Sequence, residues 1–158
     1  MLFRSLEQFE KKVVLNQYNQ YLIERFFRPT ARVDVGQAIM DYASSSIDIS
    51  DGLIGDVKKI MSASDVGALI NIEDIPLSKE MLKIYDPKKS QTFALSGGDD
   101  YELLFTASAK NLSKIMDISK EIDQKITHIG NITENKNLEC RKEGVIYEYQ
   151  DEGYLHFK

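Results

Sequence analysis

The sequence predicts an α/β (α+β) domain with a mixed β-sheet and helices packed on one face of it. Short apolar runs with strand-like alternation are separated by longer segments in which apolar residues recur at helical spacing. Strand and helix alternate three times before three final strands, an order typical of a sheet covered by helices. A length of 158 residues, with 42% hydrophobic and 28% charged residues, suits one globular domain with a sizeable core.

The N-terminal part is predicted to contain helices around one short strand. Apolar spacing predicts a helix over residues 6–27, which ends before a proline because residues that precede proline favour extended geometry. A short helix is predicted over residues 36–43 and a short strand over residues 47–49. The next helix is expected to begin at Ser50 or Asp51 and to continue to about residue 63.

The rest of the chain is predicted to supply most of the sheet. Strands are predicted over residues 68–72, 101–106 and 126–132, and a closing hairpin over residues 138–141 and 145–149. Helices are predicted over residues 78–85, with Ser78 as the N-cap, and 110–123, whereas residues 86–89 are predicted to form a loop.

Composition and charge exclude several classes of function. The net charge of −5 argues against a nucleic-acid-binding domain, which is usually basic. No apolar run approaches the length of a membrane span and no signal-peptide core follows Met1, so we expect a cytoplasmic protein with no membrane partner. Cys140 is the only cysteine, which rules out an internal disulfide, and it is expected to be a packing residue of a strand rather than a nucleophile.

The octet from Ser46 to Leu53 is the first segment that carries chemistry. It presents the carboxylates of Asp48 and Asp51, the hydroxyl of Ser50 and then a glycine, just before a predicted helix. One or two carboxylates together with substrate phosphates make a typical Mg²⁺ site, and a helix N-terminus attracts phosphate. The alternative is that Ser50 and Asp51 merely cap the helix, a role that these residue types fill routinely.

Residues 96–106 form a second segment of this kind. Two glycines are followed by two aspartates and then by an alternating apolar run that predicts a strand. Glycines allow the backbone to approach a ligand closely, and carboxylates on a loop at the end of a strand are well placed to meet one. The alternative is an ordinary glycine turn with solvated aspartates.

Together these two segments resemble the signatures of the thiamine-monophosphate kinase family. The matching sequences are Asp-Ile-Ser-Asp-Gly-Leu at 48–53 and Ser-Gly-Gly-Asp-Asp-Tyr-Glu-Leu at 96–103. Smaller matches are Arg28-Pro29 followed by Arg32, Ile129-Gly130, and Gly-Tyr-Leu-His-Phe at 153–157. The resemblance covers about residues 20–158 and implies a fold like the C-terminal domain of aminoimidazole ribonucleotide synthetase.

The resemblance implies a Mg²⁺-dependent kinase that transfers the γ-phosphoryl of ATP in line to thiamine monophosphate, giving thiamine diphosphate. It assigns Asp48 and Asp51 to Mg²⁺ and Ser50 to an ATP phosphate. It assigns Asp99, where family members often carry glutamate, and Tyr154 to the thiamine monophosphate. Packing of the C-terminal segment is the alternative role for Tyr154.

Asp56 lies one turn beyond Asp51. It is expected to be a solvated helix aspartate rather than a support for the site.

The resemblance also implies an absent part, because members of the family have two domains. Residues 1–30 are expected to be a helix and linker from the first domain, and residues 31–158 the C-terminal domain with the substrate and ATP sites. The N-terminal Mg-ATP domain is expected to be absent from this chain, which alone is expected to be inactive. The expected partners are thiamine monophosphate, that missing domain and, as an option, a second copy of the chain in a homodimer.

Two other interpretations stay open at this stage. The chain is then either a non-catalytic fragment, serving as a binding or assembly domain of the same fold, or another ATP-using member of the superfamily. The Asp-Ile-Ser-Asp-Gly-Leu sequence and the Gly-Tyr-Leu-His-Phe terminus argue against the last of these.

Overall fold

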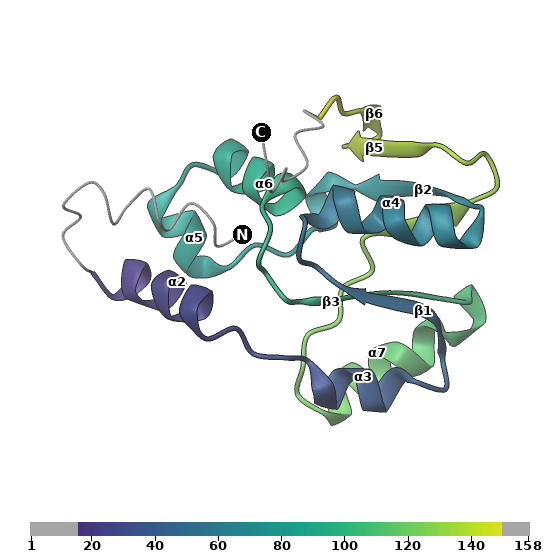
Figure 1. Cartoon of the computed structure of the whole chain (residues 1–158), viewed down its shortest axis with the longest axis horizontal. Helices are drawn as coiled ribbons and strands as arrows, with labels where there is room; N and C mark the ends of the chain where they lie inside the picture. The colour runs from purple at the N-terminus through teal and green to yellow at the C-terminus, as the bar shows by residue number, and fades with distance from the viewer. Residues whose placement is uncertain (1–15, 150–158) are drawn as a thin grey trace.

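A computed structural model describes residues 16–149 of the chain (Figure 1). The helices are α2 (Gln17–Phe27), α3 (Val33–Ile39), α4 (Leu53–Ser64), α5 (Lys79–Ile84), α6 (Pro87–Ser96) and α7 (Leu112–Glu121). The strands are β1 (Ala43–Asp48), β2 (Gly67–Asn71), β3 (Leu103–Ala107), β4 (Gly130–Thr133), β5 (Leu138–Lys142) and β6 (Val145–Ile146). Short 3₁₀ turns, η1 (Ile72–Asp74) and η2 (Ala109–Asn111), follow β2 and precede α7. This mixture confirms the predicted fold class.

The strands form a mixed four-stranded sheet and a separate two-stranded ribbon. In the sheet the order is β4-β2-β5-β6, with β2 antiparallel to β4 and parallel to β5, and with β5 antiparallel to β6. The ribbon pairs β1 with β3 in antiparallel register, so that Ile47 faces Leu104 and Asp48 faces Leu103. The order of elements along the sequence had not indicated this division into two sheets.

The ribbon lies between two apolar clusters, which explains the apolar composition of β3. Leu104 packs against the cluster that α4 forms with the four-stranded sheet, whereas Leu103 and Phe105 pack against the cluster of α3 and α7. Successive side chains of a strand point to opposite faces, so β3 supplies both clusters. Figure 1 shows α4 on one side of the ribbon and α3 with α7 on the other.

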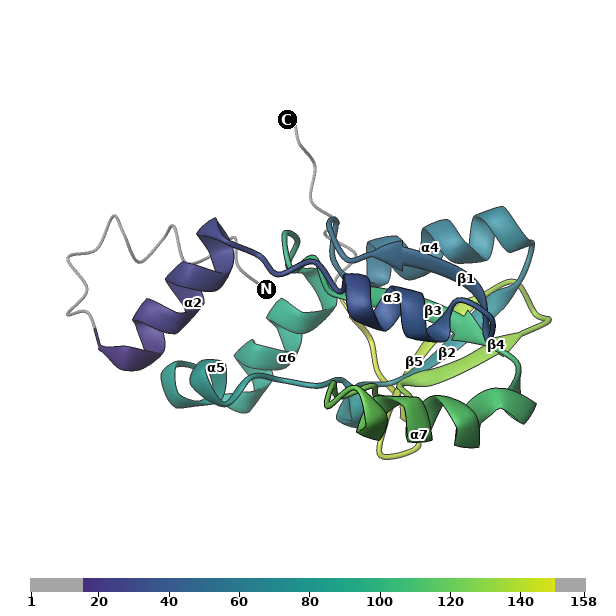
Figure 2. The same ribbon diagram turned by 90° about the horizontal axis from the view of Figure 1, so that it is seen from below.

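A third group of helices gathers at one end of the molecule. Helix α2 packs against α5, α5 packs against α6, and α6 contacts α4. Figure 2 shows this group beyond the end of the ribbon, with α3 lying along β1 and β3. Across residues 16–149, every helix is too short or too polar to cross a lipid bilayer.

Two helices differ from the sequence prediction. In the described part of the helix predicted over residues 6–27, α2 begins at Gln17, because Asn16 has extended backbone and its side chain caps α2 by accepting hydrogen bonds from the backbone N–H groups of Tyr18 and Asn19. Residues 6–15 of that prediction lie outside the described residues. The loop predicted over residues 86–89 is wrong, because Asp86 caps α6 by accepting from the Lys89 N–H and Pro87 occupies its first turn.

The other predicted elements exist with shifted ends. The predicted helix 36–43 is α3, which starts and ends earlier, and the predicted strand 47–49 is the end of the longer β1. The predicted strand 101–106 starts only at Leu103, because Tyr101 has a φ of 52°. The remaining predictions correspond to α4, β2, α5 with its Ser78 cap, α7, β4 and the β5–β6 hairpin.

Candidate functional site

Two loops bring four of the five predicted site residues together. Asp48 ends β1, Ser50 and Asp51 lie in the loop between β1 and α4, and Asp99 lies in the loop between α6 and β3. We call these the β1–α4 loop (residues 49–52) and the α6–β3 loop (residues 97–102). Tyr154, the fifth predicted residue, lies outside the described residues.

Backbone hydrogen bonds join the two loops. The Ile49 N–H donates to the Glu102 carbonyl, the Tyr101 N–H donates to the Ile49 carbonyl, and the Asp99 N–H donates to the Ser50 carbonyl, each at 2.9 Å. Pairing of the β1–β3 ribbon therefore continues beyond the ends of both strands, which lie side by side in Figure 1. The two sequence motifs thus form one structural unit.

Close packing of the two loops depends on two glycines. A Cβ on Gly98 would overlap the Ser50 carbonyl oxygen, so only glycine lets the loops approach this closely. Gly52 has a φ of 93°, and a Cβ there would lie 3.0 Å from the backbone carbonyl carbon of Ser96. The glycines of both motifs therefore serve the contact between the loops.

The capping interpretation of Ser50 and Asp51 is wrong. Helix α4 begins at Leu53, its N-cap is Gly52, and no side chain caps it. The Asp51 side chain instead pairs with Lys59, whose ammonium lies 2.5 Å from Asp51 Oδ2. Hydrogen bonds to Asp51 and then to Asp56 raise the pKa of Lys59, so the amine stays protonated.

The Asp56 side chain is buried and accepts hydrogen bonds from the backbone of the β1–α4 loop. The prediction of a solvated aspartate is therefore wrong. The Asp56 side chain is 0% exposed, and its Oδ2 accepts the backbone N–H groups of Ser50 at 2.9 Å and Asp51 at 3.1 Å. Its Oδ1 lies 2.6 Å from the Lys59 ammonium. The sequence signal for this role was the position of Asp56 in the first turn of a helix, where a carboxylate can accept backbone N–H groups.

Asp99 and Tyr101 form the opposite side of the site. Both have left-handed backbone, with φ values of 62° and 52°, and the Tyr101 hydroxyl donates to Asp99 Oδ1 at 3.1 Å. This bond, followed by the charge of Asp99, raises the pKa of Tyr101, and the charge of Asp48 adds to the effect. Backbone pairing places Asp48 beside this segment, since Asp48 faces Leu103 and the next residue, Ile49, accepts from the Tyr101 N–H. A bulky residue in the left-handed region is uncommon and marks strain of about 1–3 kcal/mol. No feature of the sequence around Tyr101 indicates this conformation.

Glu102 and Arg32 hold the α6–β3 loop against the connection between α2 and α3. The Arg32 guanidinium donates to both Glu102 carboxylate oxygens at 2.7 Å, and Arg25 donates to the same carboxylate at 3.0 Å. The bond to Glu102 raises the pKa of Arg32. Burial raises the pKa of the adjacent Asp100 carboxyl. Two of the sequence matches, the arginine after Arg28-Pro29 and the glutamate of the second motif, are thus bonded to each other.

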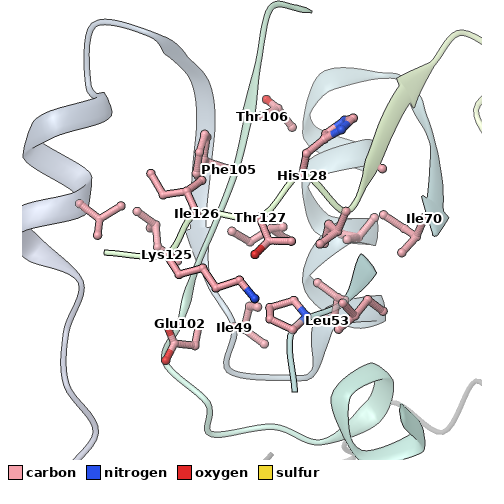
Figure 3. A pocket seen from close by; sticks show the side chains of 18 of the residues that line it. Ile49, Leu53, Ile70, Glu102, Phe105, Thr106, Lys125, Ile126, Thr127 and His128 are labelled. Carbon is pink, nitrogen blue, oxygen red and sulfur yellow. The ribbon is translucent and has the colours of Figure 1, made fainter. Parts of the chain in front are cut away.

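A cavity of about 770 Å³ lies behind the site, between the ribbon, α4 and the four-stranded sheet. Its wall is mostly apolar. Figure 3 shows Phe105, Ile126 and Thr127 lining it together with Leu53 and Ile70 of α4 and β2. None of Asp48, Ser50, Asp51 and Asp99 lines this cavity. The two loops contribute other residues to its wall, namely Ile49 from the β1–α4 loop and Asp100 and Glu102 from the α6–β3 loop.

The donor set fits Mg²⁺ only as part of a larger site. Asp48 is exposed and the Asp51 side chain, which is paired with Lys59, is 34% exposed, so both carboxylates are accessible to solvent. Among residues 16–149, no group of three or more histidine, cysteine, aspartate or glutamate residues is arranged to hold a metal ion. Mg²⁺ usually takes one or two carboxylates and completes its shell with water and phosphate oxygens. The two carboxylates of Asp48 and Asp51 match that part of the chemistry.

Comparisons with known proteins agree with the resemblance seen in the sequence. The family model described as AIR synthase related protein, C-terminal domain, matches residues 5–143. Thiamine-monophosphate kinase of Salmonella typhimurium is 38% identical over 138 residues, which cover 87% of this chain and 42% of that protein.

Solved structures give the same result. Thiamine-monophosphate kinase from Stenotrophomonas maltophilia K279a has a TM-score of 0.80 and 28% identity, covering 90% of this chain and 46% of that chain. A structure described as AaThiL complexed with AMPPCP and TMP has a TM-score of 0.76 and 33% identity, covering 99% of this chain and 48% of that chain. The chain spans less than half the length of these relatives.

Proposed function

The chain belongs to the family described as AIR synthase related protein, C-terminal domain, and we propose that it is the C-terminal half of a thiamine-monophosphate kinase. The proposed reaction transfers the γ-phosphoryl of ATP in line to thiamine monophosphate and gives thiamine diphosphate. The observation that carries the proposal is the joined pair of loops, which brings Asp48, Ser50, Asp51 and Asp99 to one site.

Each residue has a role that follows from the charges of the reactants. ATP and thiamine monophosphate are both anionic at the reacting atoms, so catalysis is mostly positioning and neutralisation of charge. Asp48 and Asp51 would hold Mg²⁺, which when bound neutralises phosphate charge, and Ser50 would contact an ATP phosphate. Asp99 would bind the thiamine part of the substrate, and Tyr154 would stack on one of its rings.

The proposal includes the division of the protein. Residues 31–158 would form the domain with the substrate and ATP sites, and residues 1–30 a helix and linker from the preceding domain. Asp48 and Asp51 would supply only part of the ligands of a nucleotide–metal complex, because among residues 16–149 no group of three or more metal-ligating side chains is arranged to hold an ion. A chain or domain that carries the other half of the relatives' length would supply the remaining ligands.

The test measures thiamine diphosphate formed from Mg-ATP and thiamine monophosphate. The chain is assayed alone and then mixed with the N-terminal half of a relative, with Asp51→Asn as the inactive variant and Lys136→Met, a remote surface change, as the control. We expect turnover only in the mixture, loss of at least about 100-fold with Asp51→Asn and no change with Lys136→Met. Absence of turnover in a mixture that forms a stable complex would favour a non-catalytic binding or assembly domain.

A further inference from the structure

The carboxylate of Asp56 connects helix α4 to the β1–α4 loop. It is fully buried, and it accepts hydrogen bonds from the Ser50 and Asp51 N–H groups and from the Lys59 ammonium. A buried charge is tolerated only when it is paired and hydrogen-bonded. Burial of Asp56 and the conformation of the loop therefore depend on each other.

Lys59 bridges two carboxylates that differ in exposure. Its Nζ lies 2.6 Å from Asp56, which is 0% exposed, and 2.5 Å from Asp51, which is 34% exposed. The lysine side chain itself is 46% exposed. An ion pair between exposed groups contributes little free energy, so the bond to Asp51 is easily exchanged, whereas the bond to the buried Asp56 is not.

We infer that Asp56 is a positioning residue of the proposed metal–phosphate site, and that Lys59 is a counter-cation that holds Asp51 until a divalent cation replaces it. This inference rests on the proposed function, which makes Asp51 a metal ligand. Asp56 acts through the backbone of Ser50 and Asp51 and contacts no substrate. Lys59 remains attached to Asp56 after it leaves Asp51, so the ammonium stays beside the bound phosphates.

The first arm of the test measures the loop directly. Amide hydrogen exchange is followed by NMR in the full 158-residue chain and in Asp56→Ala. We expect the Ser50 and Asp51 amides to exchange at least about tenfold faster in the variant, as loss of one ordinary hydrogen bond implies, while the β2 amide of Ile70 is unchanged. Wild-type exchange at Ser50 and Asp51 would overturn the role of Asp56. If Asp56→Ala does not fold, Asp56→Asn decides, because it keeps one acceptor oxygen and should give a smaller change at the same two amides.

The second arm measures exchange of the cation. Mn²⁺ is titrated into the chain, and paramagnetic broadening of the residue 48–51 amides gives its affinity. We expect Lys59→Met to bind Mn²⁺ about three- to tenfold more tightly, because the competing ammonium is gone. Lys58→Met is the matched control, since it removes the same charge one residue earlier, from a side chain whose ammonium lies 5.9 Å from the Tyr149 ring. It should change the affinity less than about twofold.

The outcomes separate this inference from the proposed function. Equal Mn²⁺ affinities for Lys59→Met and Lys58→Met, or weaker binding by Lys59→Met, would overturn the role of Lys59 while leaving the metal site intact. Absence of any Mn²⁺ effect at residues 48–51 of the wild-type chain would instead contradict the proposed metal ligands, and the counter-cation role with them. The amide-exchange arm uses no metal and decides the role of Asp56 in either case.

Discussion

At the scale of single residues, Cys140 shows how position determines chemistry. It is 2% exposed and packs in the cluster formed by α4 and the four-stranded sheet. Burial, followed by the nearby charge of Glu139, raises the pKa of the Cys140 thiol from 9.0 to about 11. A thiol is a nucleophile only as its thiolate, so this cysteine is inert at neutral pH. Its predicted role as a packing residue is confirmed.

The raised pKa gives a prediction about reactivity and pH. At pH 8 the thiolate fraction is about 100-fold below that of a thiol with a pKa of 9.0, so native Cys140 should react with a disulfide reagent at least that much more slowly than the urea-unfolded chain. The unfolded state loses the thiol proton first as pH rises. The contribution of Cys140 to the free energy of unfolding should therefore fall between pH 9 and about 11.

Urea unfolding at several pH values, compared with Cys140→Ala, isolates this effect from the lysines and tyrosines that titrate in the same range. A smaller decline in stability across that range is expected for the variant. Equal reaction rates for the native and unfolded thiols would contradict the prediction.

Residue identity predicted only the parts of the site that have a local signature. Asp48, Ser50, Asp51 and Asp99 stand in recognisable motifs, and the structure brings them together. Asp56 was assigned to solvent, because its burial depends on how the preceding loop folds back over α4. Tyr101 was assigned only to a strand, because nothing in its sequence neighbours requires a positive φ.

At the scale of elements, the site is a contact between two loops whose positions are set by different parts of the fold. The β1–α4 loop is held by Asp56, and the α6–β3 loop by the ion pair of Arg32 with Glu102. Helix α6 also contributes, because its last residue, Ser96, lies against Gly52.

The sequence prediction missed most of α6, since Asp86-Pro87 was interpreted as part of a loop although an aspartate followed by proline also begins helices. The pairing of β1 with β3 was likewise beyond local reasoning, because their separation in sequence exceeds any hairpin.

Gly98→Ala should separate these two loops. The added Cβ would overlap the Ser50 carbonyl oxygen, so the α6–β3 loop must move, and we expect the free energy of unfolding in urea to fall by about 1–3 kcal/mol. Exchange of the Asp99 amide, which donates to that carbonyl, should become faster.

The matched control is Gly36→Ala in α3, where the new methyl would lie 4.0 Å from Leu103 Cδ2. It should be neutral or stabilise by up to about 1 kcal/mol. A Gly98→Ala protein as stable as Gly36→Ala would show that the loops are not in close contact.

At the scale of the whole molecule, β3 couples the two apolar clusters. Leu104 belongs to one cluster, whereas Leu103 and Phe105 belong to the other. Loss of packing on either side of this strand therefore weakens its pairing with β1, and with it the joined loops of the site. The apolar run of β3 was enough to predict a strand from the sequence, but which residues share a face with which helices depends on contacts between distant elements.

This coupling predicts that residues 16–149 unfold as one cooperative unit. Ile39 is 1% exposed in the cluster of α3 and α7, and Ile39→Ala should lower the free energy of unfolding by about 2–4 kcal/mol. If β3 transmits this loss, amides in α7, such as Ile118, and amides in α4, such as Val57, should lose protection against hydrogen exchange by the same free energy. Met40→Ala, at an exposed position next to Ile39, is the control and should leave both amides unchanged. Faster exchange confined to α3 and α7 would show instead that the two clusters open independently. In that case the ribbon that carries Asp48 would be held by the α4 cluster alone.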